Sequence, residues 1–112
     1  MSTPLVLRFS DFEWHGAEQR LTRDGQALEL GSRAFDLLGL LASQAGRVVS
    51  KETAFEHVWP GRVVEENNLQ VQVSTLRRLL GRDAIATVPG RGYRFTWPVA
   101  QLTAGAAAPP AP

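Results

Sequence analysis

A stripe of four aliphatic side chains at helical spacing is the feature that most constrains the fold of this 112-residue chain. The four are Leu69, Val73, Leu76 and Leu80, separated in turn by four, three and four positions. At about 100° per residue, this spacing keeps all four within about 60° of one another around a helix axis. The pattern predicts an amphipathic helix over about residues 66–80, with the stripe packed against a core.

The opposite face of this predicted helix is polar, and no acidic residue lies between Asn67 and Leu80. A helix face that only meets water more usually carries Glu and Lys. The side chains of this face and its flanks are amides, hydroxyls, guanidinium groups and one valine: Asn67, Gln70, Val71, Ser74, Thr75, Arg77 and Arg78. All of these types have partners on DNA, from base edges and phosphates to the thymine methyl group. A solvated polar face with one stray valine is the alternative interpretation.

Charge is distributed unevenly along the chain, although the net charge of +1 by itself indicates no nucleic-acid partner. Residues 62–97 hold six Arg and three acidic residues, a balance of +3, whereas residues 1–61 hold six basic and eight acidic residues, a balance of −2. Eleven of the twelve basic residues are Arg, which pairs with phosphate and guanine through two hydrogen bonds at once. Genomic base composition explains the preference for Arg over Lys equally well, but not the clustering.

Short segments of partly alternating polarity before residue 31 predict a small antiparallel sheet. These segments are Leu5–Phe9, Phe12–Trp14, Gln19–Leu21 and Ala27–Leu30. Between the last two, Asp24-Gly25 is a strong signal for a two-residue hairpin turn.

Helical periodicity replaces this alternation from Gly31 onward. Apolar residues at helical spacing predict a first helix that begins near Gly31 and ends near Gly46. Ser50 is a good N-cap for a second helix over Lys51–Trp59, which Pro60-Gly61 ends.

Two further strands are predicted after the third helix, over Ala84–Val88 and Tyr93–Trp97. The two glycines of the linking segment Pro89–Gly92 permit positive φ, and therefore a narrow turn with Arg91 at its tip. A short helix, a polar-faced helix and then a hairpin are typical of a winged helix-turn-helix, a small α+β fold.

Four segments closely resemble the OmpR/PhoB-type winged-helix domain of bacterial transcriptional regulators. They are Gly46–Glu52, Val58-Trp59, Leu69–Leu80 and Ile85–Phe95, and the resemblance covers about residues 5–98. Its most specific part is the T-V-x-G-x-G-Y-R-F motif of residues 87–95, behind a helix that ends in Leu-Arg-Arg-Leu. The resemblance implies a four-stranded N-terminal sheet, three helices and a C-terminal β-hairpin wing.

The resemblance also implies how the domain meets DNA. The third helix is the recognition helix in the major groove, with its polar face toward the bases, and the wing tip 89–92 lies at the minor groove. Trp59 is implied as a phosphate contact through its indole N–H, and Tyr93 is equally suited to the core. Four residues of the wing region are implied as DNA-binding: Thr87, Arg91, Tyr93 and Arg94. Several relatives are basic where this chain has Ser74, Thr75 and Pro89, so we expect weaker binding per domain, with Arg91 in the minor-groove role.

Partners and domain organisation follow from the same resemblance. The implied partners are double-stranded DNA, a second copy of the domain in tandem on the DNA, and RNA polymerase through the 60–66 loop. Residues 1–100 are predicted to form the DNA-binding domain, and residues 101–112 an Ala/Pro-rich flexible linker to a regulatory domain outside this chain. Phosphorelay response regulators place a receiver domain first, whereas this chain is similar to N-terminal variants without one.

Other functions find little support in the sequence. With no Cys, the chain forms no disulfide and no Cys-based zinc site, which fits a reducing cytoplasm, and neither His15 nor His57 has metal-ligand spacing. Gly90-Arg91-Gly92 lacks the third glycine and the following helix of a dinucleotide-binding loop. We therefore expect no enzyme activity, cofactor, metal, small-molecule ligand or membrane span. A winged-helix module that binds proteins instead of DNA is the alternative function.

Overall fold

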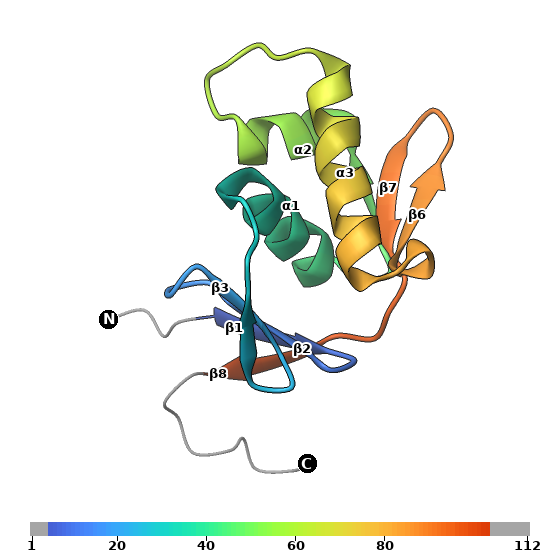
Figure 1. The fold of residues 1–112 in the computed structure, drawn as a ribbon. Coiled ribbons are helices and arrows are strands. Elements are labelled where there is room, and N and C mark those ends of the chain that lie inside the picture. The colour runs from blue at the N-terminus through green and yellow to red at the C-terminus, as the bar shows by residue number, and fades with distance from the viewer. Residues whose placement is uncertain (1–4, 104–112) are drawn as a thin grey trace.

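The computed structural model describes residues 5–103, which form two antiparallel sheets and three α-helices (Figure 1). The N-terminal sheet contains β1 (Leu5–Phe9), β2 (Phe12–His15), β3 (Arg20–Arg23), β4 (Gln26–Leu28) and β8 (Ala100–Thr103). The helices are α1 (Ser32–Ser43), α2 (Lys51–Val58) and α3 (Glu66–Leu80). The other elements are β5 (Val48–Ser50), the 3-10 turn η1 (Arg82–Ala84), β6 (Ile85–Val88) and β7 (Gly92–Phe95).

The predicted N-terminal meander is confirmed, and its strands follow the order β4-β3-β2-β1-β8. Arg23 lies opposite Gln26, with only Asp24 and Gly25 between them. Both turn residues have positive φ, 52° and 82°, which is the backbone of a type I′ turn. The Asp-Gly signal therefore marks the hairpin correctly.

Strand β8 corrects the predicted end of the domain. The sequence predicts a linker from residue 101, yet Ala100–Thr103 pairs antiparallel with β1, with Arg8 opposite Ala100 and Val6 opposite Leu102. This edge strand forms because β1 presents unpaired backbone groups there. Ala100–Thr103 does alternate between apolar and polar residues, but the sequence analysis grouped it with the Ala/Pro-rich segment that follows. The rest of the predicted linker, residues 104–112, lies outside the described residues.

Helix α1 lies between the N-terminal sheet and the pair formed by α2 and α3 (Figure 1). Its side chains Leu37, Leu38 and Leu41 are fully buried, because both neighbouring layers pack on it. The helix ends at Ser43, a few residues before the predicted end at Gly46. Gly46 instead has φ of 83°, and its N–H donates to the carbonyl of Phe95 on β7 at 2.9 Å.

The helix-turn-helix pair forms as its sequence signals predict. Ser50 caps α2, because its Oγ accepts a hydrogen bond from the backbone N–H of Thr53 at 3.0 Å. On α3, the predicted stripe points inward: Leu69, Val73 and Leu76 are buried, and Leu80 is half-buried.

The C-terminal hairpin pairs β6 with β7, with Ile85 opposite Phe95 and Val88 opposite Gly92. A third strand, β5, was not expected from the sequence and pairs with β7 on its other side, with Val49 opposite Tyr93. Three residues are too few to show a strand period, so only the tertiary contact with β7 defines β5.

Trp14 joins the N-terminal sheet to α1. Its ring stacks on Phe35 with centroids 4.7 Å apart, and its indole N–H donates to the carbonyl of Phe35 at 3.0 Å. The indole lies directly against Gly39 on the next turn of α1, where a Cβ atom would fall 2.1 Å from Trp14 Cζ2. Gly39 is therefore required for close packing and not for its backbone freedom.

Gly39→Ala should lower the free energy of unfolding by about 1–3 kcal/mol, because the added methyl group displaces the Trp14 ring from a packed core. Urea unfolding monitored by circular dichroism measures this change. In a Trp14→Ala background the same substitution should be neutral or stabilising, since alanine favours helix over glycine by about 1 kcal/mol. An equal loss in both backgrounds would show that the indole is not the obstacle.

Candidate nucleic-acid interface

Helix α3 presents the predicted polar face to solvent. Five of the predicted DNA-facing residues are exposed along it: Asn67, Gln70, Val71, Ser74 and Arg78. Val71 is 49% exposed, whereas Leu69 and Val73, the nearest residues of the buried stripe, are at most 1% exposed. The burial of one face thus leaves an accessible valine among polar side chains on the other.

The hydroxyl group of Thr75 and the guanidinium group of Arg77 make hydrogen bonds within the protein, and the expectation that both face DNA stays a prediction. Thr75 is half-buried, and its Oγ1 donates to the carbonyl of Val71 at 3.0 Å. The guanidinium of Arg77 donates to the carbonyl of Ile85 from Nε at 3.1 Å and from Nη2 at 2.8 Å. Nη2 also donates to Thr87 Oγ1 at 2.8 Å. Arg77 therefore joins α3 to β6, and Thr87 supports this link.

The hairpin tip is exposed and carries Arg91, as predicted. The backbone N–H of Arg91 donates to the backbone carbonyl of Val88 at 3.0 Å, and this hydrogen bond closes the turn. Gly92 has φ of 154°, and a Cβ atom there would meet the backbone of Val49 on β5, 2.0 Å from its carbonyl oxygen. A residue with a side chain at this position would push β5 away from the hairpin. Arg94 on β7 is exposed as well.

Two predicted contact residues, Trp59 and Tyr93, have most of their surface in the core. Trp59 is 8% and Tyr93 6% exposed, and both belong to the main cluster of buried side chains. Within residues 5–103, no buried side-chain nitrogen or oxygen lacks a hydrogen-bond partner, and no hydrogen bond uses the Trp59 indole N–H. The phosphate contact of this indole N–H stays a prediction. Tyr93 has the core position that the sequence left open.

An ion pair joins the beginning of α2 to the beginning of α3. Lys51 Nζ lies 2.8 Å from Glu66 Oε2, and this hydrogen bond together with the carboxylate charge raises the pKa of Lys51 above its ordinary value of 10.5. A raised lysine pKa stabilises the folded state below about pH 10.5, and this contribution is lost as the pH rises through the folded-state value. At physiological pH the pair is therefore intact.

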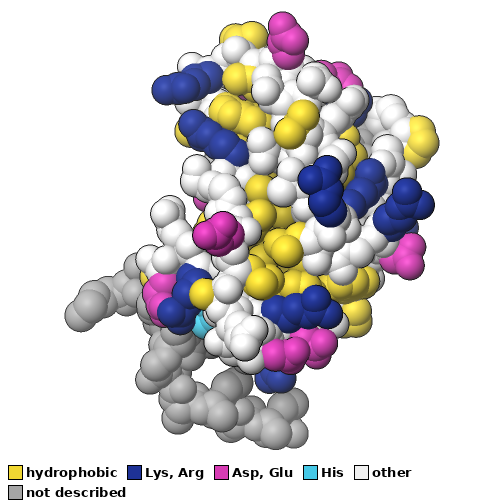
Figure 2. Space-filling model, viewed as in Figure 1, with side chains coloured by type: hydrophobic (Ala, Val, Ile, Leu, Met, Phe, Trp, Pro, Cys, Tyr) yellow, Lys and Arg dark blue, Asp and Glu magenta, His cyan; other side chains and the backbone are white. Residues whose placement is uncertain are grey.

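A hollow beside the C-terminal half of α3 places one arginine that the sequence analysis did not assign to the site, Arg82, beside two that it did. Its volume is about 420 Å³, and its lining residues are Ser74, Arg77, Arg78 and Arg82. Arg82 was not among the predicted contacts because it follows Gly81, outside the helical pattern. In Figure 2, Lys and Arg side chains gather over α3 and beside the hairpin.

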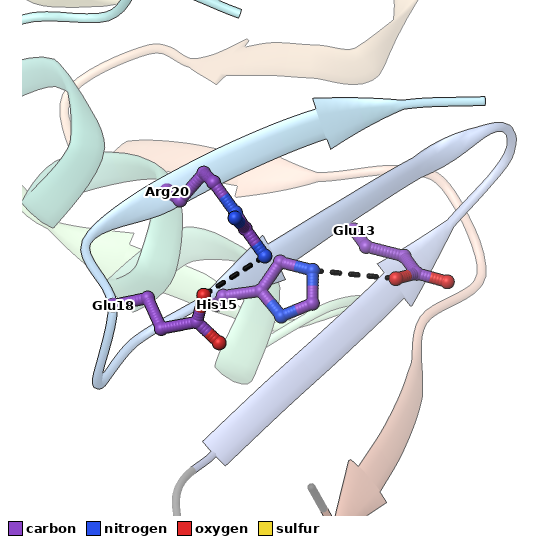
Figure 3. A network of polar contacts seen from close by, with 4 residues as sticks. All are labelled: Glu13, His15, Glu18 and Arg20. Atoms are coloured by element: carbon purple, nitrogen blue, oxygen red, sulfur yellow. Dashed lines mark ion pairs between the residues drawn. The ribbon is translucent and has the colours of Figure 1, made fainter. Parts of the chain in front are cut away.

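The remaining polar clusters of the described residues lie on the N-terminal sheet. His15 Nε2 is 3.3 Å from Glu13 Oε1, and Arg20 Nη2 is 2.8 Å from Glu18 Oε1 (Figure 3). The Arg20–Glu18 pair is exposed, and exposed ion pairs contribute about 0–1 kcal/mol. Within residues 5–103, no three His, Cys, Asp or Glu side chains are grouped to hold a metal ion. No helix in this range is long and apolar enough to cross a bilayer.

Comparison with known proteins identifies the family. Residues 25–95 match the sequence model described as "Transcriptional regulatory protein, C terminal". The chain belongs to this family. The resemblance to OmpR/PhoB-type domains is thereby confirmed, and the family is one of transcriptional regulators and not of enzymes.

Individual relatives agree with this assignment. The domain is 40% identical over 84 residues to the response regulator protein PmrA of Pseudomonas aeruginosa, covering 73% of this chain and 38% of PmrA. Among solved structures, the DNA-binding domain of Escherichia coli CadC matches with a TM-score of 0.76 and 30% identity, over 88% of this chain and 98% of that one. The DNA-binding domain of E. coli CpxR matches with a TM-score of 0.74 and 33% identity, over 81% and 95%. These matches confirm the winged-helix fold.

The chain spans only part of its curated relatives. It covers 38% of PmrA, 16% of the transcriptional regulator HilA of Salmonella typhi, and 44% of the phosphate regulon regulatory protein PhoB of Shigella flexneri.

Arg77→Met should lower the free energy of unfolding by about 1–3 kcal/mol, because it removes the hydrogen bonds to Ile85 and Thr87 while retaining a long apolar side chain. Arg78→Met is the matched control: it removes the same charge from an exposed neighbour that has no side-chain hydrogen bond within residues 5–103. Urea unfolding of the two variants checks this. If both lose the same stability, the link between α3 and β6 contributes nothing.

Proposed function

We propose that residues 5–103 bind double-stranded DNA in a sequence-specific manner, as the DNA-binding domain of a bacterial transcription regulator. The observation that carries this proposal is the exposed, acid-free face of α3, which lies beside a hairpin tipped by Arg91. A helix with this face fits the major groove, about 12 Å wide, while a narrow basic hairpin fits the adjacent minor groove. The solved DNA-binding domains of CadC and CpxR, which share this fold at 30% and 33% identity, support the proposal.

Individual contacts follow from exposure and chemistry. Asn67, Gln70 and Val71 are proposed to meet base edges, since amides pair with adenine and an aliphatic group contacts the thymine methyl. Arg91 is proposed at the minor groove, and Arg94 and the indole N–H of Trp59 at phosphates. In the unbound domain Thr75, Arg77 and Thr87 make hydrogen bonds to other residues and Tyr93 is buried, so these four are proposed to support the contact residues.

Further partners remain part of the proposal. A second copy of the domain is proposed to bind in tandem on repeated half-sites, and the exposed 60–66 loop to meet RNA polymerase. Thr103, where the described residues end, is proposed to lead through a linker to a regulatory domain. The proposed compartment is the bacterial cytoplasm, where chromosomal DNA is accessible.

A salt titration of DNA affinity tests the central proposal. Fluorescence anisotropy with a duplex selected from a random pool should give a log–log slope of about −0.9 per phosphate contact. A domain that binds only proteins would show no salt-dependent DNA affinity. That result would favour the alternative function, a winged-helix interaction module.

Val71→Ala should weaken binding to the selected duplex by about 1 kcal/mol, because it removes apolar contact with a thymine methyl group. Binding to unselected DNA and the stability of the domain should stay unchanged, since Val71 is 49% exposed. Val63→Ala is the matched control, because Val63 is a fully exposed valine of the 60–66 loop and not of α3. Equal affinities for parent and Val71→Ala would remove α3 as the base-reading helix.

Arg91→Ala should weaken binding most on duplexes with A/T flanks, where the narrow minor groove has a strong negative potential. The salt slope should fall by roughly one unit. Anisotropy titrations on A/T-flanked and G/C-flanked duplexes measure both effects, with Arg20→Ala on the N-terminal sheet as the charge-matched control. A mutant that behaves like the parent on both duplexes would show that the hairpin tip stays off the DNA.

A further inference from the structure

The hollow lined by Ser74, Arg77, Arg78 and Arg82 is a concentrated positive site at the C-terminal end of α3. No carboxylate lies within 4.0 Å of any of its three guanidinium groups among residues 5–103, where the ion pairs involve other side chains. None of the lining residues is acidic. The charge of this hollow is therefore available to an anion.

One of the three guanidinium groups, that of Arg77, is already held in position. Nε and Nη2 of Arg77 donate to Ile85 and Thr87, and these bonds occupy the N–H groups of both atoms. Nη1 keeps two further donors, because a guanidinium has five N–H groups in a rigid plane. Little side-chain entropy is lost when such a pre-positioned group binds an anion.

The remaining arginine, Arg82, is brought back beside α3 by Gly81. Gly81 has φ of 134°, a conformation that residues with a side chain rarely adopt, and it ends the helix and begins η1. The turn is secured on both sides: the Ala84 N–H donates to the Gly81 carbonyl at 3.3 Å, and the Thr96 hydroxyl donates to the Asp83 carbonyl. Arg82 is therefore exposed on a well-supported backbone.

We propose that Arg78, Arg82 and the Ser74 hydroxyl bind one phosphate group of the DNA backbone, with the Arg77 charge behind them. This inference rests on the proposed function. In recognition helices the N-terminal residues contact base edges, so the opposite end of α3 is placed to meet the strand that borders the groove. Guanidinium groups suit phosphate oxygens because they donate two parallel hydrogen bonds.

The proposal assigns Arg78 to a phosphate and not to a guanine base, the other partner that arginine commonly has on DNA. It also adds Arg82, a residue of η1 outside both the helix and the hairpin, to the DNA-binding surface. A contact of this kind positions α3 in the groove but carries no sequence information.

The test measures DNA affinity of Arg82→Ala against the selected duplex and an unselected one. Affinity should fall about tenfold on both, and the salt slope should lose about 0.9 units, as for one phosphate contact. Arg82→Lys should keep the slope, since the charge remains. Arg20→Ala, which removes a charge from β3, should leave the slope unchanged. Thermal unfolding confirms that each variant is folded.

A duplex with single methylphosphonate substitutions locates the contact, because each removes one backbone charge. At one position the parent should lose about tenfold in affinity. At that same position Arg82→Ala should lose less than the parent, because only Arg78 and Ser74 still bind this phosphate. If the parent binds DNA but Arg82→Ala matches it in affinity and slope, the phosphate site is wrong and the proposed function stands. If the parent shows no salt-dependent DNA binding, the proposed function itself fails.

Inorganic phosphate distinguishes a free anion from the DNA backbone. Added at constant ionic strength, millimolar phosphate should leave the DNA affinity of the parent unchanged. Competition by phosphate that disappears in Arg82→Ala would show a site for a free anion and overturn the assignment to DNA.

Discussion

The link from Arg77 to β6 decides how the two proposed DNA-contacting elements are related. Arg77 lies on α3, and its partners Ile85 and Thr87 lie on the first strand of the hairpin. A helix and a hairpin that approach adjacent grooves must keep their separation, or only one of them fits at a time. Hydrogen bonds from a planar guanidinium restrict this separation more strongly than apolar packing does, because they require a particular direction as well as contact.

The rest of the core supports the hairpin from the other side. Phe9 of β1 packs edge-on against Phe95 of β7 with ring centroids 5.1 Å apart, and Phe12 of β2 stacks on Trp97 at 6.2 Å. The N-terminal sheet therefore braces the hairpin although it lies away from α3 (Figure 1). Both α3 and the hairpin are therefore supported by the core behind them.

The exposed faces were easier to predict than the contacts of individual side chains. The stripe from Leu69 to Leu80 defines which side of α3 is buried, so Asn67, Gln70 and Val71 emerge at the surface as expected. Thr75 and Arg77 occupy the flanks of that face, where a side chain of suitable length can turn either way. Thr75 bonds to Val71, one helical turn back, whereas Arg77 bonds to Ile85 and Thr87 on another element. The periodicity of the sequence does not show which of these hydrogen bonds a side chain will make.

The sequence by itself determined the three helices, the Asp24-Gly25 turn and the arginine-tipped hairpin, because each depends on interactions between residues close in the chain. Only the tertiary structure decided that β5 and β8 are strands, since three or four residues become a strand when a distant partner supplies the hydrogen bonds. It also decided that Gly39 must receive the Trp14 ring, and that Arg82 stands beside Arg78. All of these features depend on contacts between elements that are distant in the sequence, and the local spacing of residues does not specify such contacts.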